Sequence, residues 1–414
     1  MPEFVTPQLI ASVTVIVVMI HIILIGALYL VLLERKLSAY AQDRLGPNRV
    51  GPMGLFQPIA DAIKLLLKED YIPKRADRIL FLLAPGLTII PAFIAFAVIP
   101  WAGTLEIFGE KVKIVGADVN IGIIYLIAVT SLGVYGVALG GWASNNKYSF
   151  LGGLRATAQM ISYEIPMGLA VLALILTAGT IRPGEMIAQQ LEGQWYIIHQ
   201  PIAALLFYIC MLAETNRLPF DLAEAESELV GGWHTEYSDS MKWALFFAGE
   251  YAHIITGSAF FTVMFLGGWS ISPVGLWPDL PIVGGIGLIL LQFGIVMAKV
   301  FALICLTMLV RWTVPRFRYD QLMRLAWEGM IPTALLVLLV TSFVVFMGWT
   351  SQMWLASIAT VGIIWVVRPM LPKQANPNHK LELLGSRFSP KTHEALTTSP
   401  VEPQGLDPVV ASDA

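Results

Sequence analysis

Charge is scarce in this sequence. Only 13% of the 414 residues are Asp, Glu, Lys or Arg, whereas 56% are apolar. Soluble domains carry about 25% charged residues, and a soluble chain of this composition would have too little polar surface to cover its core. The composition therefore excludes an ordinary soluble protein and indicates a chain that crosses a membrane several times.

Cysteine is equally rare, and Cys210 and Cys305 stand far apart inside apolar runs. The absence of a CxxC pair and of a His/Cys cluster argues against a disulfide framework and against a metal site. No glycine-rich phosphate turn is present either, and the net charge of −3 gives no indication of nucleic-acid binding. We therefore expect no metal, flavin or nucleotide site in this chain, and no nucleic-acid partner.

Long apolar stretches, by contrast, are abundant. Nine can be marked, at 9–33, 79–103, 119–143, 157–181, 197–213, 243–269, 282–310, 331–349 and 352–367. The first has no charged residue and no basic segment before it, which favours a retained span over a signal peptide. Two of them, 197–213 and 352–367, are short for a span. The sequence predicts an all-α polytopic membrane protein with eight to nine transmembrane helices.

The positive charges are unevenly distributed. The loops at 34–78, 143–156, 214–242 and 311–330, together with the C-terminal residues from 368 onward, hold 22 of the 26 Lys and Arg residues, and the other loops hold three. The positive-inside rule puts the rich loops and the tail in the cytoplasm and the N-terminus outside a bacterial inner membrane. We expect a membrane domain over 1–370 and, because 371–414 lacks an apolar period, a disordered tail.

An amphipathic helix is expected on the cytoplasmic side, after the turn-forming residues 46–52. Apolar residues recur at helical spacing, at Phe56, Ile59, Ile63, Leu66 and Leu67. Polar residues fall on the opposite stripe, at Gln57, Asp61, Lys64 and Lys68. Such a helix, predicted over 54–69, lies in the membrane interface. Its apolar face either covers the ends of the spans or helps to frame an opening for a lipid-soluble molecule.

The loop at 214–242 is strongly acidic. Its carboxylates are Glu214, Asp221, Glu224, Glu226, Glu228, Glu236 and Asp239. Asp221, Glu224 and Glu228 share one face of a helix, where like charges repel and share protons. Glu250 follows inside an apolar stretch, where an ionised carboxylate is costly. The row predicts a proton relay, and a solvated acidic loop is the alternative.

Two further ionisable residues stand in apolar stretches. Glu164 lies just inside the fourth stretch, where it either caps the span or needs a partner or water. Lys299 lies inside the seventh stretch. If it is buried, we expect Lys299 to need a carboxylate on a neighbouring span.

Taken together, the cytoplasmic loops resemble those of one family: the H subunits of the proton-pumping NADH:quinone oxidoreductase, respiratory complex I. The matching strings are ERK at 34–36, RLGPNR at 44–49, QPIAD at 57–61, RATAQ at 155–159, ETNR at 214–217, PFD at 219–221, EAE at 224–226, EYS at 236–238 and PRFRYDQ at 315–321. The resemblance covers residues 10–350 in family order. Each string alone is weak, and their combination is specific.

The resemblance implies a translocase subunit that is not catalytic alone and that forms the membrane end of a tunnel for a quinone such as ubiquinone. It implies partners among the membrane and peripheral subunits, which would carry FMN and the iron–sulfur clusters, and contact with membrane lipid. The implied proton-relay residues are Glu164, Glu214, Asp221, Glu224, Glu226, Glu228, Glu236 and Glu250. The residues expected at the tunnel are Glu34, Arg35, Arg44, Arg49, Phe56, Ala60, Asp61 and Arg217.

The sequence departs from the family pattern at two positions: His253 stands where asparagine is commoner, and Glu328 stands where a lysine is expected. Two other interpretations compete. The chain resembles, less closely, the membrane subunit of an energy-converting hydrogenase or of a dehydrogenase with another donor. An ion/proton antiporter using Lys299 and Glu250 is a third interpretation, although it would not need four elaborate loops on one side.

Overall fold

The structure is a computed structural model and describes residues 6–107, 110–221, 231–237, 241–275, 279–349 and 352–367. Residues 1–364 form one compact unit, and residues 365–414 are grouped separately. The tail at 371–414 lies outside the described residues, as do the predicted relay residues Glu224, Glu226 and Glu228. The fold is therefore described for the compact unit.

Among the described residues, six helical runs are long and apolar enough to cross a membrane. They are α1 (Pro7–Ala41), α3 with η2 (Arg78–Ala95, Phe96–Val98), α4 with α5 (Gly122–Ser131, Gly133–Ala143), α6 (Lys147–Ala178), α11 (Ile286–Thr313) and α12 with η4 and α13 (Tyr319–Arg324, Leu325–Met330, Ile331–Phe346). The remaining apolar helices are α9 (Pro201–Glu214), α10 (Met241–Phe265) and α14 (Trp354–Val367). The all-α polytopic class is confirmed, and the number of spans stays a prediction.

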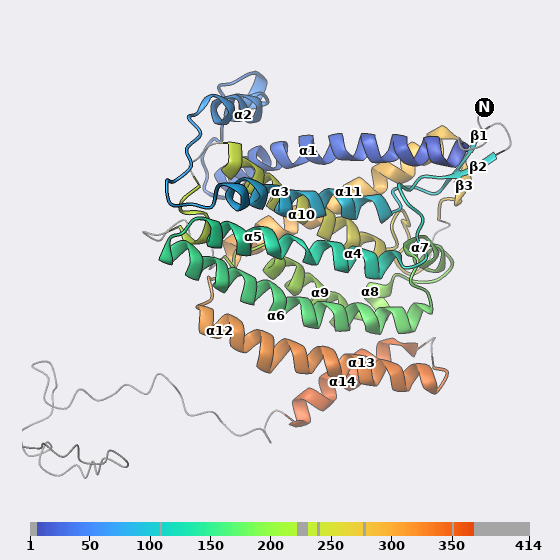
Figure 1. Ribbon diagram of the computed structural model, residues 1–414. Coiled ribbons are helices and arrows are strands. Elements are labelled where there is room, and N and C mark those ends of the chain that lie inside the picture. Colours follow the sequence, from blue (N-terminus) through green and yellow to red (C-terminus); the bar gives the residue numbers. More distant parts are fainter. Residues whose placement is uncertain are drawn as a thin grey trace, which may run out of the picture. The chain divides into compact units, whose positions relative to one another are not determined.

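The helices lie side by side in a bundle (Figure 1), in which α10 is the most enclosed. Helix α10 packs against α3 and α11, and α6 packs against α5, α9 and α13. Small residues allow the closest approaches. A Cβ on Gly136 of α5 would lie 2.0 Å from Thr88 Oγ1 of α3, so only glycine permits this contact. Tight packing around α10 fixes the positions of the polar side chains that it carries.

One end of the bundle carries a small sheet, and we call it the strand end. Its strands are β1 (Thr104–Ile107), β2 (Glu110–Lys113) and β3 (Val283–Gly284), in the order β2-β1-β3. Strand β1 pairs antiparallel with β2, with Thr104 opposite Lys113, and parallel with β3, with Thr104 opposite Val283. The short helices α7 (Pro183–Glu192) and α8 (Tyr196–His199) lie nearby.

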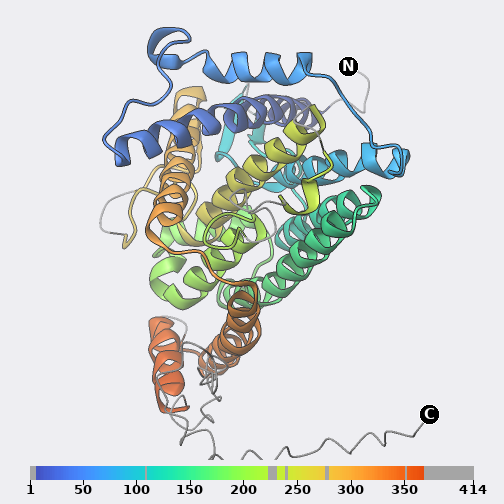
Figure 2. The same ribbon diagram turned by 90° about the vertical axis from the view of Figure 1, so that its left-hand side faces the viewer.

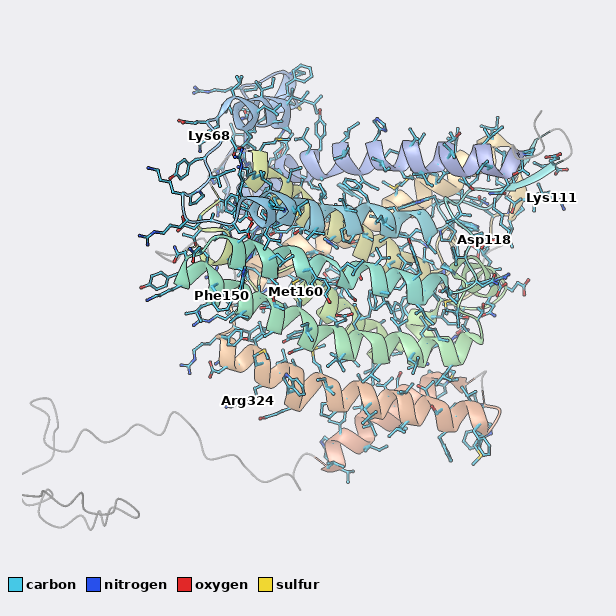
Figure 3. All side chains as sticks on the ribbon, viewed as in Figure 1. Lys68, Lys111, Asp118, Phe150, Met160 and Arg324 are labelled. Atoms are coloured by element: carbon cyan, nitrogen blue, oxygen red, sulfur yellow. The ribbon has the colours of Figure 1, made fainter. Side chains whose placement is uncertain are left out.

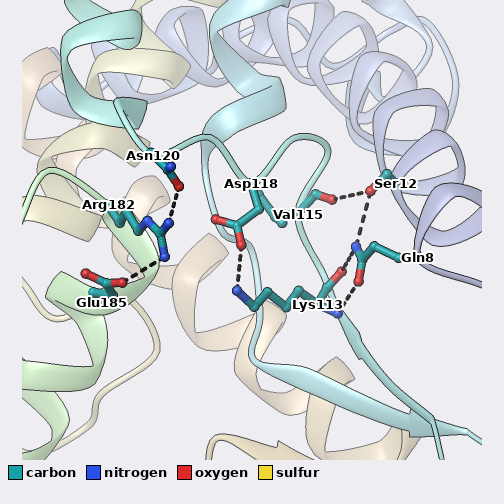
Figure 4. A network of polar contacts seen from close by, with 8 residues as sticks. All are labelled: Gln8, Ser12, Lys113, Val115, Asp118, Asn120, Arg182 and Glu185. Carbon is teal, nitrogen blue, oxygen red and sulfur yellow. Dashed lines mark hydrogen bonds and ion pairs between the residues drawn. The ribbon is translucent and has the colours of Figure 1, made fainter.

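A network of polar contacts ties the strand end together (Figure 4). Gln8 donates to the carbonyl of Lys113 at 3.1 Å and accepts from its backbone N–H at 2.9 Å, which links α1 to the sheet. The Lys113 ammonium lies 2.5 Å from Asp118, and Arg182 pairs with Glu185 at 3.1 Å. These pairs join residues close in sequence and hold the loops in place.

The opposite end we call the basic end. It holds η1 (Pro52–Gly54), α2 (Gln57–Leu67), η3 (Gly232–His234) and the segment 314–318. Figure 3 places Lys68, Phe150 and Arg324 at this end and Lys111 and Asp118 at the strand end. Helix α2 lies crosswise to the bundle beside the end of α1, as the two views in Figures 1 and 2 show. The amphipathic helix predicted over 54–69 is therefore present, although it begins later.

Candidate functional site

A cavity of about 710 Å³ opens at the basic end between α1, α2 and α10. This volume lies within the range of about 300–1,000 Å³ typical of sites for small molecules. One wall is apolar because α1 presents Leu24, Ala27, Leu28 and Val31, which recur at the spacing of one helix face. The cavity thus offers an apolar route beside the bundle.

Helix α2 faces the cavity with a different stripe from the one expected. Pro58, Asp61, Ala62 and Leu65 line the cavity, and these positions share one helix face. The strongly apolar stripe is exposed instead, with Leu67 82% accessible. The expectation that the apolar stripe frames the opening is therefore wrong.

An ion pair explains how α2 is turned. Arg35 of α1 lies 2.8 Å from Asp61, and Gln57 donates to the same carboxylate at 2.9 Å. Because Asp61 must reach Arg35, the boundary between the polar and apolar stripes faces the cavity. As a result, Phe56 and Ala60 do not line the cavity, although the sequence placed both there.

One end of the cavity is lined by charged residues. Arg311 of α11 forms an ion pair with Glu34 of α1, and the Tyr251 hydroxyl donates to the other oxygen of Glu34 at 2.5 Å. The guanidinium carbon of Arg217 lies 4.4 Å from the centroid of the Tyr251 ring, and its Nη2 lies 3.5 Å from Glu250. Four helices or their loops thus meet in one chain of polar contacts next to an apolar wall.

A buried amide holds Arg217 in this position. Helix α9 ends at Glu214, and the Gln159 side chain donates to Ala213 O at 3.0 Å, to Asn216 Oδ1 at 3.1 Å and to Phe220 O at 2.9 Å. The Gln159 side chain is fully buried, and leaving its N–H groups without acceptors there would be costly, so these bonds are kept. The segment after α9 is therefore fixed, and Arg217 is directed toward α10.

Asp221 joins the same region through a neighbouring loop. Arg316 lies 3.4 Å from the Asp221 carboxylate, and the backbone N–H of Phe317 donates to Pro219 O at 3.3 Å. The rings of Phe220 and Phe317 lie 5.6 Å apart. Asp221 also lines a small cavity of about 40 Å³ together with Arg217 and Glu250. The segment 314–318 thereby holds Asp221 near the charged end of the large cavity.

Two further carboxylates lie close together inside the bundle. Ser131 of α4 donates to Glu164 of α6, and the Glu214 carboxylate of α9 interacts with Glu164 and with Thr130. Two carboxylates so placed repel each other when both are ionised. Glu164 is therefore not a simple cap on its span.

Glu236 belongs to a separate contact near η3. The Asn146 side chain donates to Glu236 at 2.5 Å, just before α6 begins. The neighbouring Tyr237 hydroxyl donates to Phe81 O at 3.2 Å, and burial raises the pKa of Tyr237, so it stays a donor. This contact anchors the loop and does not line the large cavity.

The structure divides the predicted site residues into groups. The large cavity is lined by Glu34, Arg35, Arg44, Asp61 and Arg217. Asp221 and Glu250 adjoin it through their contacts with Arg217 and Arg316, Glu164 and Glu214 form the inner pair, and Arg49, Phe56 and Ala60 lie off the cavity. These are placements, and the functional role of each residue stays a prediction.

Sequence reasoning missed Tyr251 and Arg311. Both line the large cavity, and together they occupy both oxygens of Glu34. A signal was available, because a tyrosine hydroxyl in an apolar helix needs a partner when it is buried. Arg311 stands in the last turn of α11, where a cation also suits the helix dipole, so its sequence position alone did not point to a site.

Lys299 is held differently from the expectation. Its ammonium donates to the backbone carbonyls of Leu266 at 2.6 Å, Gly268 at 2.8 Å and Ser270 at 2.6 Å, and it lies 4.1 Å from the centroid of the Trp195 ring. The expected carboxylate does not come from a neighbouring span: Asp279, whose charge acts on Lys299, lies in the loop before α11. The carbonyls just past α10 are left without helical partners, and they provide the acceptors that a buried cation needs.

No group of three or more His, Cys, Asp or Glu side chains in the described part of the chain could hold a metal ion. The fold and the site define a polytopic helical membrane protein with a ligand-sized cavity, apolar along one wall and charged at one end. The chain belongs to the NADH dehydrogenase family, whose sequence profile matches residues 13–342.

Curated relatives agree with this family, and all three described here are H subunits of NADH-quinone oxidoreductases. One from Cytophaga hutchinsonii is 46% identical over 334 residues, 79% of this chain and 95% of the relative. One from Geobacter metallireducens is 47% identical over 332 residues, 80% of this chain and 95% of the relative. That of Protochlamydia amoebophila is 48% identical over 318 residues, 77% of this chain and 92% of the relative.

Proposed function

We propose that the chain is a membrane subunit of a proton-translocating NADH:quinone oxidoreductase and that its large cavity admits quinone from the membrane. The observation that carries this proposal is the combination of an apolar wall and a charged end in one cavity of about 710 Å³. The names of the relatives, which belong to NADH-quinone oxidoreductases, support it. FMN and iron–sulfur clusters are assigned to partner subunits.

The two parts of the cavity suit the two parts of a quinone. An isoprenoid tail is apolar and matches the wall formed by Leu24, Ala27, Leu28 and Val31. A quinone head group carries carbonyl oxygens, which accept hydrogen bonds from donors such as Arg217 and Arg35. The cavity would therefore guide the head group past the charged end while the tail stays against α1.

The same charged end supplies a physical connection to proton transfer. Reduction of a quinone to a quinol takes up two protons with two electrons, so negative charge forms on the head group, beyond the charged end of the cavity, unless protons arrive. Arg217 contacts Glu250, and Tyr251 contacts Glu34. A new charge near the cavity therefore shifts the protonation equilibrium of both carboxylates. We assign Glu164, Glu214 and Asp221, with the loop residues Glu224, Glu226, Glu228 and Glu236, to the same relay.

We also propose that the basic end faces the cytoplasm of a bacterial inner membrane, with the N-terminus outside. The distribution of Lys and Arg supports this orientation. Cysteines replacing Lys68 and Lys111, which lie at opposite ends (Figure 3), would report it. In intact cells an impermeant thiol reagent should label position 111 and spare position 68, and labelling of position 68 alone would contradict the orientation.

The cavity is tested by a matched pair of substitutions on α2. Ala62 lines the cavity, whereas Ala60 stands on the same helix and does not. Ala62→Trp should fill part of the passage and lower quinone-dependent NADH oxidation by about tenfold or more, because a misplaced substrate loses much of its rate. Ala60→Trp should leave it near normal. Reduction of a soluble artificial electron acceptor by the assembled complex should persist in both.

The outcomes separate passage from assembly. Equal loss of quinone-dependent and artificial-acceptor activity in Ala62→Trp would indicate failed assembly, which the amount of intact complex on a native gel would report. A second blocking variant, Ala248→Trp from α10, tests the same passage from the opposite wall. Full quinone-dependent activity in both variants, in a correctly assembled complex, would refute quinone passage through this cavity.

A further inference from the structure

A second, much smaller cavity lies deeper in the bundle, between α4, α9 and α10. Its volume is about 20 Å³, and one water needs roughly 10–15 Å³ on the same measure. The polar residues that line it are Thr130, Glu214, Thr215, His253 and Thr256. A cavity of this size with several polar partners suits one ordered water, whereas an apolar cavity would stay dry.

The hydrogen bonds already made in the surroundings decide how such a water can bind. The Thr130 hydroxyl donates to Ile127 O at 3.0 Å, and the Thr256 hydroxyl donates to Ala252 O at 2.7 Å. The Thr256 proton is therefore committed, whereas the Thr130 hydroxyl also lies within reach of the Glu214 carboxylate and can donate to it. The carboxylate of Glu214 is an acceptor when it is ionised and a donor when it is protonated.

The imidazole of His253 is the other group that can exchange a proton. Its Nε2 lies 3.3 Å from the carbonyl of Thr88 on α3, and because a carbonyl only accepts, this nitrogen carries the hydrogen. Nδ1 is then the nitrogen with the lone pair. A water in the cavity can accept from a protonated Glu214 and donate to Nδ1 of His253.

Within the described part of the chain, three acidic residues lie around His253. Glu214 faces the cavity from α9, Glu164 of α6 interacts with Glu214, and Glu250 stands one turn before His253 on α10. Helix α3 contributes the carbonyl of Thr88. The neighbouring carboxylates can stabilise a transient imidazolium and so offset part of the cost of burying that charge.

We propose that this cavity holds an ordered water that joins Glu214 to His253, so that His253 is a further proton-exchanging residue of the chain. In the transfer, the O–H bond of Glu214 breaks as an O–H bond to the water forms. The water gives up another proton to Nδ1, and the products are a carboxylate, a water and an imidazolium. The transfer carries a proton from the inner carboxylate pair toward α3. Its role in turnover rests on the function proposed above.

The cavity can be closed without altering any polar group. Gly257 lines it, and a Cβ at this position would lie 2.7 Å from Cγ of Met211, which also lines it. In Gly257→Ala the new methyl group, or the Met211 side chain that it displaces, takes the space of the water. Gly168→Ala is the matched control, because no atom of the described residues outside its own stretch of helix lies within 4 Å of a Cβ there.

The first test is an experimental map of the assembled complex at a resolution that shows waters. Density for one water between Glu214 and His253 is expected in the wild type and in Gly168→Ala, and it should be absent in Gly257→Ala. An empty cavity in the wild type would overturn the proposal. This result does not depend on whether quinone passes through the large cavity, so the two proposals fail separately.

The second test is a double-mutant cycle on quinone reduction and proton pumping. His253→Asn can keep the hydrogen bond to Thr88 and cannot take up a proton. Gly257→Ala and His253→Asn should each lower both rates, by about tenfold or more for loss of a proton-transfer partner. The double variant should be no slower than Gly257→Ala alone, because the water acts through His253. Unchanged rates in either single variant, or effects that multiply, would overturn the proposal.

Discussion

The two ends of the bundle use charged residues in different ways. At the strand end, Lys113 and Asp118 have side chains that are 59% and 43% exposed. At the basic end, the side chains of Arg217 and Glu250 are only 12% and 13% exposed, and they come from the turn after α9 and from α10. Exposed pairs contribute about 0–1 kcal/mol each, so the strand-end pairs do little more than position loops.

Buried charge is a different matter, because its desolvation offsets much of the attraction. A chain that needed only stability would be served as well by apolar residues at Glu34, Arg217, Glu250 and Arg311. Glu34, Arg217 and Arg311 line the large cavity instead, Glu250 lines the small cavity beside it, and the four side chains contact one another across the bundle. The comparison teaches that the costly charges are concentrated where a ligand-sized opening meets the interior.

The largest effect should follow from Glu250→Gln. The substitution keeps the size of the side chain but removes the charge beside Arg217 and the exchangeable proton. Quinone reduction and proton pumping should fall together by roughly 100-fold, since a lost proton-transfer group typically costs that much. Both rates can be measured in membrane vesicles, and the amount of intact complex should stay near normal.

Glu185→Gln is the matched control for that experiment, because it removes a carboxylate from an arginine pair at the strand end. It should leave both rates unchanged. If Glu250→Gln retained full activity and full pumping, the relay would be refuted and the buried pair would be only a structural contact. If Glu250→Gln instead lowered the amount of intact complex, the pair of Arg217 and Glu250 would be needed for contact with neighbouring subunits.

A middle-sized effect is expected from Lys299→Met. The substitution keeps an apolar stem but leaves three buried carbonyl oxygens without their donor. Each orphaned acceptor costs about 1–3 kcal/mol, so the amount of assembled complex should fall severalfold, as measured on a native gel. Lys111→Met, an exposed change at the same end, should have no effect. A normal yield of Lys299→Met would show that water replaces the ammonium.

The smallest effect concerns Glu185 itself. A hydrogen bond from Thr180, and then the charge of Arg182, lower the pKa of this carboxyl below its ordinary value of 4.5. The lowered pKa means that the pair stabilises the fold above pH 4.5 and that this contribution is lost as pH falls through the folded pKa. Because the group is half exposed, Glu185→Gln should cost less than about 1 kcal/mol at pH 7.

Thermal unfolding of the detergent-purified complex measures this difference. The gap between wild type and Glu185→Gln should shrink when the pH is lowered below 4.5, where the wild-type carboxyl also becomes neutral. A gap at pH 7 well above about 1 kcal/mol would show that the exposed Glu185 pair is held as tightly as the buried pair of Arg217 and Glu250 at the basic end. The contrast between the two ends would then be lost.

Much of the site could be anticipated from the sequence. Glu34, Asp61 and Arg217 were placed at a cavity because they stand in strings that resemble one family, and they do line one cavity. Helical periodicity pointed to Phe56, and the QPIAD string at 57–61 contains Ala60. Periodicity locates the apolar stripe of α2 but not the direction in which the helix is turned. The ion pair between Arg35 and Asp61 sets that direction, and no local pattern reveals it.

The sequence by itself determined the class of protein, because apolar stretches longer than a bilayer is thick can be satisfied only as helices in a membrane. Only the tertiary structure decided the partners of the polar residues. Lys299 donates to backbone carbonyls, Tyr251 donates to Glu34, and His253 and Glu214 line the same cavity. Such pairings depend on how helices far apart in the chain pack together, and the spacing of residues along one helix contains no record of that packing.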